Sequence, residues 1–213
     1  MHDECFSAKG WVVVEKTAPF VRKHDAVLAG GTALALHIGH RISGDLDFFT
    51  NKTFFADEVI FNLGQLGLPL RMMDKGERHI IASIDGIKFS LFVYPYPFTA
   101  LLVPYRGLLV AGIADIAAMK VIAISQRGTR RDFIDLYCIM QQASVHDVVR
   151  TMSEKFGKEG INAIHIGKSL VFFADADSDY DPEYLPGKQI KWETVKTFFR
   201  KNVKSFVYSL SEA

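Results

Sequence analysis

The sequence has little cysteine and no long apolar run, and both absences narrow the class of protein. Cys5 and Cys138 are the two cysteines among 213 residues, and they lie far apart in the chain. We therefore expect no disulfide framework and a reducing compartment, the cytoplasm. No apolar run approaches the roughly 20 residues that cross a bilayer, so we expect no membrane association.

The sequence also lacks a strong excess of charge of either sign. The 25 Lys and Arg residues against 24 Asp and Glu residues give a formal net charge of +1. This balance excludes a protein that wraps nucleic acid by wholesale electrostatic attraction, although it permits a local basic patch. With 49% hydrophobic residues, the chain can form one large or two small domains with a substantial core.

The N-terminal part is predicted to form a mixed sheet with helices. Apolar spacings of three and four predict a helix over residues 6–23, and a short apolar run predicts a strand over 26–29. Gly30 and Gly31 end that strand, and Thr32 is placed to cap a helix that runs to about Gly39. Further predicted elements are a strand in "GDLDFFT", a helix over 55–66, and strands over 70–73, 78–84, 87–94 and 108–110.

The pattern changes near residue 112 and becomes almost entirely helical. Helices are predicted over 115–126, 130–142, 145–155, 161–173 and 190–210. We therefore expect an α+β protein with an α/β core over 1–112 and a helical domain over 113–213.

Residues 37–40 read "HIGH", the adenylate-binding signature of class I aminoacyl-tRNA synthetases. Here the four residues fall at the end of a predicted helix, and no lysine-rich second signature follows. We interpret His37 as a partly buried side chain and the Gly39-His40 pair as the end of the helix, where a cation is favoured.

The residues that flank "HIGH" have a stronger chemical rationale. Gly30 and Gly31, between a strand and a helix, allow a triphosphate to approach the backbone and the free N–H groups of the helix start. Asp45 and Asp47 alternate along the next strand, so both carboxylates point to one face. Such carboxylates bind Mg²⁺ together with substrate phosphates. A glycine pair or two alternating aspartates are commonplace alone, but this order of elements is far more specific.

The blocks "LAGGTALAL", "HRISGDLDFF" and "DIAAMKVIAISQRGTRRDFIDLY" together resemble the nucleotidyltransferase family of AbiEii/AbiGii-type toxins, in the DNA polymerase β-like superfamily. The resemblance covers roughly residues 10–175. It implies a polymerase β-like core, followed here by a helical bundle, that transfers a nucleoside monophosphate from an NTP to a hydroxyl of RNA or protein. It also implies a toxin–antitoxin or abortive-infection role, tRNA as the first acceptor to test, and a cognate antitoxin encoded nearby.

The resemblance assigns roles to the first block. Asp45 and Asp47 would bind Mg²⁺ or Mn²⁺, which activates the attacking hydroxyl and steadies the leaving pyrophosphate. The residues that would contact or orient the NTP phosphates are Gly30, Gly31, Thr32, Arg41 and Ser43.

The second block supplies candidate charged groups. Lys120 and Arg127 are seven residues apart and project from nearly one helix face. The resemblance implies that Lys120 neutralises phosphates as a mobile point charge; a lysine on a solvated helix face is the alternative. Asp132 and Asp135 also share a face and could form a structural ion pair, with Arg131 bonding Asp135, or could orient the acceptor or contact Lys120.

One position departs from the superfamily pattern. A third carboxylate usually lies on a later strand and acts as the base that prepares the nucleophile. The corresponding strand here is "IKFSLFVYPY", where Ser90 occupies that position. Asp132 or Asp135 could substitute for it. Alternatively, the protein is a module that binds nucleotide or a partner with the same residues and transfers nothing.

Overall fold

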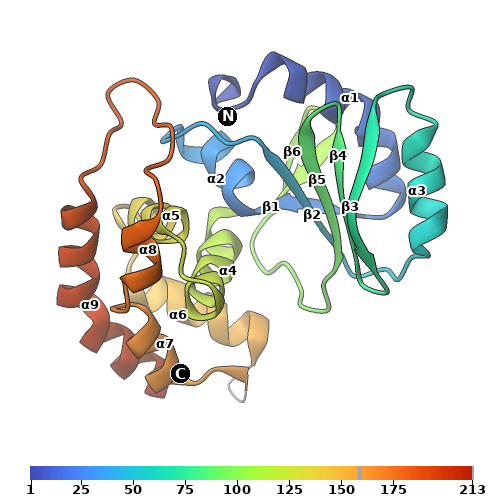
Figure 1. Cartoon of the computed structure of the whole chain (residues 1–213). Helices are drawn as coiled ribbons and strands as arrows, with labels where there is room; N and C mark the ends of the chain where they lie inside the picture. The colour runs from blue at the N-terminus through green and yellow to red at the C-terminus, as the bar shows by residue number, and fades with distance from the viewer. Residues whose placement is uncertain (158–159, 213) are drawn as a thin grey trace. The chain divides into compact units, whose positions relative to one another are not determined.

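A computed structural model of the chain describes residues 1–157 and 160–212 (Figure 1). The chain divides into two compact units. The first comprises Met1–Pro97 and Leu101–Ala111, and the second comprises Phe98–Ala100 and the chain from Gly112 onward. The expected α+β class is confirmed, because the sheet lies in the first unit and the second unit is helical. No described helix is long and apolar enough to span a bilayer.

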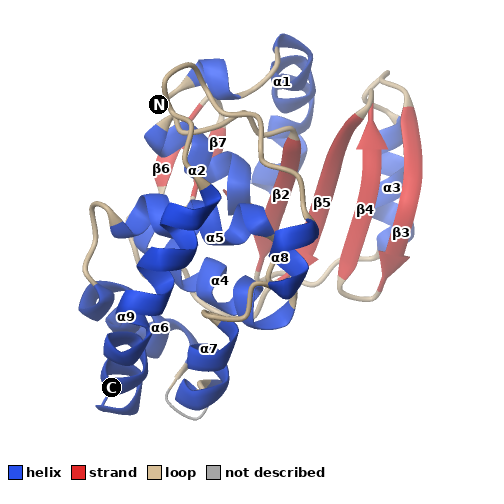
Figure 2. Cartoon of the chain, turned by 60° about the vertical axis from the view of Figure 1, so that its left-hand side comes forward, coloured by secondary structure: helices blue, strands red, loops and turns tan. Residues whose placement is uncertain are grey.

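The sheet of the first unit brings together strands from distant parts of the chain. Over the described residues it has seven strands in the order β3-β4-β5-β2-β1-β7-β6, of which Figure 2 shows β3, β4, β5 and β2 side by side. The strands are β1 (Val27–Ala29), β2 (Asp45–Thr50), β3 (Leu70–Gly76), β4 (His79–Ile84), β5 (Ile87–Val93), β6 (Val103–Tyr105) and β7 (Leu108–Val110). β2 pairs antiparallel with β1 and parallel with β5, so its two aspartates lie in the middle of the sheet.

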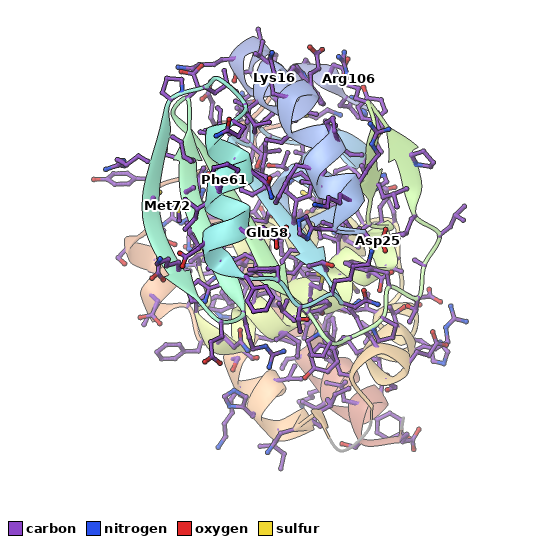
Figure 3. All side chains as sticks on the ribbon, turned by 90° about the vertical axis from the view of Figure 1, so that its right-hand side faces the viewer. Lys16, Asp25, Glu58, Phe61, Met72 and Arg106 are labelled. Atoms are coloured by element: carbon purple, nitrogen blue, oxygen red, sulfur yellow. The ribbon has the colours of Figure 1, made fainter. Side chains whose placement is uncertain are left out.

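One face of this sheet is the core of the first unit. The helical elements here are η1 (Asp3–Cys5), α1 (Ala8–Lys23), α2 (Gly30–Ile38) and α3 (Ala56–Gly64). Figure 3 shows α1 and α3 over one face of the sheet. The ring centroids of Phe20 on α1 and Phe89 on β5 are 6.4 Å apart, and those of Phe89 and Phe48 on β2 are 5.3 Å apart. Side chains that alternate with these phenylalanines therefore point to the opposite face of the sheet.

The second unit packs its helices around aromatic side chains. Its helices are α4 (Ile113–Gln126), α5 (Arg130–Met140), α6 (Val145–Phe156), α7 (Ala163–Ser169), α8 (Ala174–Ser178) and α9 (Trp192–Glu212). The ring of Phe133 lies 5.2 Å from that of Phe173 and 5.3 Å from that of Phe199, and all three side chains are buried. These contacts join α5, α9 and the segment before α8.

A buried ion pair attaches residues 98–100 to the second unit. Lys155 Nζ lies 2.9 Å from Asp115 Oδ1, and both side chains are 0% exposed. The Asp115 carboxylate also accepts hydrogen bonds from the backbone N–H groups of Thr99 and Ala100, at 3.1 and 2.8 Å. This shared acceptor explains why these three residues belong to the second unit.

The observed elements differ in places from the predicted ones. α2 begins at Gly30, with no side-chain cap, so Thr32 lies inside the helix and not before it. β6 was not among the predicted strands; it contains Pro104, which is tolerated because β6 is an edge strand. The helix predicted over 161–173 covers only Ala163–Ser169, and the acidic segment that follows begins with a separate helix, α8.

Candidate active site

The turn from β1 into α2 brings the backbone close to a carboxylate. Gly30 has φ +70°, a conformation that glycine adopts without strain, and a Cβ added there would lie 3.3 Å from Asp47 Oδ2. The first N–H groups of a helix have no partner within the helix. The start of α2 therefore offers hydrogen-bond donors beside the Asp47 carboxylate.

Gly31 leaves room for a buried guanidinium. A Cβ at Gly31 would lie 2.3 Å from one terminal nitrogen of Arg41, which is closer than real side chains approach. Arg41 is 4% exposed and donates a hydrogen bond of 3.0 Å to the carbonyl oxygen of Ile42. The glycine pair thus gives both the turn and the space for Arg41 beside the helix start.

Thr32 and Ser43 hold α2 against the start of β2. Their hydroxyl oxygens are 2.8 Å apart, and the Thr32 hydroxyl also bonds the backbone carbonyl oxygen of Asp45. Both side chains are buried. The hydroxyl expected to contact phosphate is thus used inside the protein, which leaves the backbone N–H of Thr32 as the group suited to that contact.

β2 separates its residues as the sequence predicted. Leu46 and Phe48 are 0% exposed, whereas Asp45 and Asp47 are half-buried on the opposite face. Among the described residues, no cluster of three or more His, Cys, Asp or Glu side chains could enclose a metal ion. Two carboxylates still suit Mg²⁺, which is commonly held by one or two carboxylates with the phosphates of a substrate.

β5 adds two residues to the same face. The parallel register pairs Asp45 with Lys88 and Asp47 with Ser90, and paired residues on adjacent strands point to the same side of a sheet. Ser90 is 0% exposed, and its Oγ has no hydrogen-bond partner among the residues that the structure describes. Sequence reasoning missed Lys88, because a parallel pairing between distant strands leaves no local signal.

The "HIGH" residues have structural roles within the first unit. His37 Nε2 donates a hydrogen bond of 2.8 Å to the carbonyl oxygen of Ala111. Gly39 has φ +60° and ends α2 in the left-handed conformation. His40 is 4% exposed. The interpretation of this segment as a helix end with a partly buried His37 is confirmed.

In the second unit, Lys120 lies between two carboxylates. Its Nζ is 2.9 Å from Asp132 Oδ1 and 2.6 Å from Asp135 Oδ2, and its side chain is 7% exposed. Neither a solvated lysine nor a mobile point charge describes this residue, so both of those expectations were wrong. Arg131 was expected to bond Asp135, but it is exposed, and Asp135 bonds Lys120.

Asp132 is the centre of this cluster. Arg127 donates hydrogen bonds of 2.9 and 3.1 Å to its two oxygens, and the Thr129 hydroxyl donates one of 2.8 Å. Burial would raise the pKa of Asp132, but the charges and hydrogen bonds of Lys120 and Arg127 outweigh it and lower the pKa to about 2. A carboxylate with this pKa is a poor general base near neutral pH, so Asp132 is unsuited to replace the missing third carboxylate.

Comparison with known sequences places this chain in a family. The family described as "Nucleotidyl transferase AbiEii toxin, Type IV TA system" matches residues 18–67 and 71–199. The curated "Uncharacterized protein aq_aa25" of Aquifex aeolicus (strain VF5) is 36% identical over 202 residues, which cover 91% of this chain and 94% of that protein. Both matches extend over both units.

Solved structures share the fold at low sequence identity. MenT4, the nucleotidyltransferase toxin Rv2826c from Mycobacterium tuberculosis H37Rv, aligns with a TM-score of 0.59 and 17% identity over 97% of this chain and 86% of its own. JHP933 from Helicobacter pylori aligns with a TM-score of 0.54 and 16% identity, over 94% of this chain and 90% of its own. The family match, supported by this fold, shows that the chain is a nucleotidyltransferase that belongs to the AbiEii toxin family.

Proposed function

We propose that this nucleotidyltransferase moves a nucleoside monophosphate from an NTP to a hydroxyl of RNA, with tRNA as the acceptor class, and releases pyrophosphate. The observation that carries the proposal is the approach of Gly30 to the Asp47 carboxylate, because it brings donors for phosphate and a ligand for a divalent cation to one point. Nucleotidyl transfer requires both at the triphosphate.

The phosphates of the NTP would bind at the start of α2. The backbone N–H groups of Gly30, Gly31 and Thr32 are free of intrahelical partners there, and the helix dipole favours an anion. The guanidinium of Arg41 lies beside Gly31 and adds positive charge. Ser43 orients this loop through Thr32.

Asp45 and Asp47 would hold Mg²⁺ or Mn²⁺. When bound, such an ion lowers the pKa of the attacking hydroxyl and stabilises the charge that develops on the leaving pyrophosphate. The Asp45 carboxylate has no hydrogen bond or ion pair with a residue that the structure describes, so a ligand can occupy it without breaking a contact. During transfer, a bond forms between the acceptor oxygen and the α-phosphorus as the bond from that phosphorus to pyrophosphate breaks.

In the second unit, Arg127 is the cation we assign to anion binding, whereas Lys120 is enclosed by the Asp132 and Asp135 carboxylates. Arg127 keeps 65% of its side chain exposed while it bonds Asp132, so an incoming anion can reach it. Asp132 and Asp135 act in this proposal as positioning residues, which fix Lys120, and not as bases. Their own oxygens are already engaged by cations.

The biological role we propose is that of a toxin that modifies RNA in the cytoplasm, where NTPs and tRNA occur. The toxin family to which the chain belongs supports this role. An antitoxin encoded nearby would then be its functional partner. A protein hydroxyl is the other acceptor that the same chemistry could use.

The direct test is incubation of the protein with each α-³²P-labelled NTP, Mg²⁺ and total tRNA. We expect label in tRNA with one or more NTPs, and no label with Asp47→Ala. Asp57→Ala is the matched control, because Asp57 is an exposed aspartate of α3 that pairs with Lys75. If Asp47→Ala labels tRNA as well as the wild type does, the site assignment is wrong.

A second candidate function is nucleotide binding without transfer. Ser90 of β5, which pairs with Asp47 of β2, favours this function, because the expected base at that position is a carboxylate. If the protein still binds NTP but no NTP labels RNA or protein, nucleotide binding without transfer is favoured.

A further inference from the structure

Ser90 is a buried polar side chain with an unused hydrogen-bonding group. Its residue is 0% exposed, and no described residue bonds its hydroxyl oxygen. Buried hydroxyls normally have a partner, because an unpaired one lowers stability. The two residues that flank Ser90 on β5, Phe89 and Leu91, are buried apolar side chains of the opposite face. An alanine would therefore serve as well here if packing were the only requirement.

The neighbours of Ser90 in the sheet are specific. Asp47 of β2 pairs with it on one side, and Ile81 of β4 pairs with it on the other. All three side chains point to the face opposite α1, since Phe48 and Phe89, which alternate with them, contact one another on the α1 side. The unused hydroxyl thus lies next to the carboxylate to which we assign a divalent cation.

We propose that Ser90 is a positioning residue whose hydroxyl binds a water molecule of the hydrated cation held by Asp45 and Asp47. This inference rests on the proposed function. Mg²⁺ gives up its water reluctantly and keeps several water ligands when it binds to proteins. A serine hydroxyl can accept a hydrogen bond from such a water, and it can donate one as well.

The chemistry of serine separates this role from that of a third carboxylate. A carboxylate at position 90 would ligate the ion directly and add a negative charge. A neutral hydroxyl instead orients a water ligand, as groups outside the direct ligands of a metal commonly do. Asp45 and Asp47 would then hold the ion together with its own waters, and the phosphates of an NTP would supply further oxygen ligands.

The test measures the binding of Mn²⁺ alone, followed by the electron paramagnetic resonance signal of free Mn²⁺, so that no turnover is involved. Ser90→Ala should weaken Mn²⁺ binding about tenfold, the lower end of the effect of losing a group that orients a metal ligand. Ser90→Thr keeps the hydroxyl and should bind within about twofold of the wild type. An unchanged dissociation constant for Ser90→Ala overturns the proposal.

A matched serine on the neighbouring strand is the control. Ser83 of β4 pairs with Lys88, so it lies on the same face as Ser90 but one strand farther from β2. Ser83→Ala should bind Mn²⁺ as the wild type does. A loss equal to that of Ser90→Ala would mean that any serine-to-alanine change on this face weakens binding, and would overturn the proposal.

The melting temperature without metal separates this role from a packing role. Ser90→Ala removes an unpaired hydroxyl, so its melting temperature in EDTA should equal or exceed that of the wild type. If instead Ser90→Ala and Ser90→Thr both melt at lower temperature and both bind Mn²⁺ weakly, position 90 acts through packing and the proposal fails.

Asp47→Ala distinguishes failure of this inference from failure of the proposed function. If Asp47→Ala abolishes Mn²⁺ binding while Ser90→Ala leaves it unchanged, the metal assignment to Asp47 stands and only the role of Ser90 is lost. If Asp47→Ala leaves Mn²⁺ binding unchanged, the metal assignment itself is wrong, and the role of Ser90 falls with it.

Discussion

Gly30 and Asp47 lie so close together that a Cβ atom added to Gly30 would be only 3.3 Å from the Asp47 Oδ2 atom. The two residues come from adjacent elements, the turn after β1 and the strand β2, and Ala29 pairs with Asp47 across the ladder. The glycine therefore serves the site in two ways. It adopts a φ of +70°, and it keeps the space beside the carboxylate open.

We predict that Gly30→Ala lowers nucleotidyl transfer at least tenfold while the protein still folds. The added methyl group strains a left-handed backbone, at a cost of about 1 to 2 kcal/mol, and narrows the space in which phosphate would approach Asp47. Transfer to tRNA and the free energy of unfolding in urea are the measurements. Gly64→Ala is the control, because a Cβ at Gly64 meets open space in α3, and it should leave transfer unchanged.

Lys88 gives a second prediction, which concerns nucleotide affinity. It pairs with Asp45 in the parallel register and is half-buried on the face of the two aspartates, yet it forms no ion pair with a residue that the structure describes. An unengaged cation beside a phosphate site strengthens the binding of an anion. Lys88→Gln should weaken NTP binding about tenfold, the effect of one charged hydrogen bond.

Equilibrium dialysis with labelled NTP measures this effect, and two variants control it. Lys88→Arg keeps the charge and should retain most of the affinity. Lys75→Gln removes a lysine of β3 that already pairs with Asp57, so its affinity should equal that of the wild type. Equal affinity in Lys88→Gln and the wild type would show that Lys88 does not contact the nucleotide.

Some of this site could be read from the sequence because its signals are local. The alternation of Asp45 and Asp47 with Leu46 and Phe48 follows from the period of a strand, and the structure has this separation of charged and apolar residues. The glycine pair marks a strand-to-helix turn, because few residues other than glycine accept a positive φ. Neither inference depends on how the strands pair.

The rest could not be read because it depends on pairing and burial between distant segments. The parallel register of β2 and β5 brings Lys88 beside Asp45, and forty-three positions separate these residues in the sequence. Lys120 has the spacing of a surface lysine but lies buried, because α5 brings two aspartates to it. Thr32 fits a helix cap, but its hydroxyl instead bonds Ser43 across the loop.

The ion pair of Lys155 and Asp115 gives a third prediction, on stability. Both side chains are 0% exposed, and Asp115 also accepts the N–H groups of Thr99 and Ala100. Lys155→Met leaves a buried carboxylate without its cation and should lower the free energy of unfolding by about 3 to 5 kcal/mol. Urea unfolding measures this loss.

Adding Asp115→Asn to Lys155→Met should recover part of that loss. The amide carries no charge, and its oxygen can still accept a hydrogen bond from the backbone. Lys196→Met is the control, since Lys196 bonds Asp177 and Glu193, whose side chains are 49% and 74% exposed, and its loss should lower stability far less than the loss of Lys155 does. Equal losses for Lys155→Met and Lys196→Met would contradict the strong coupling expected of the buried pair.

The fourth prediction concerns pH and the carboxylate of Asp132. Its pKa is about 2 in the folded protein, against about 3.9 for an aspartate in an unfolded chain. Because the folded pKa is the lower one, the stabilisation is fully present above about pH 4. It is lost as the pH falls from about 4 towards 2. The integrated contribution is roughly 2 kcal/mol.

Asp132→Asn should therefore be less stable than the wild type above pH 4, and the difference should shrink as the pH falls. Urea unfolding between pH 6 and pH 3 measures it, and comparison with the variant removes the contribution of every other carboxylate common to both proteins. Asp57→Asn is the control, because Asp57 is 88% exposed and water screens its bond to Lys75. If the difference in unfolding free energy between Asp132→Asn and the wild type stays constant from pH 6 to pH 3, then Lys120 and Arg127 do not hold the carboxylate ionised. Asp132 would then be available as a base, and its assignment as a positioning residue would have to be withdrawn.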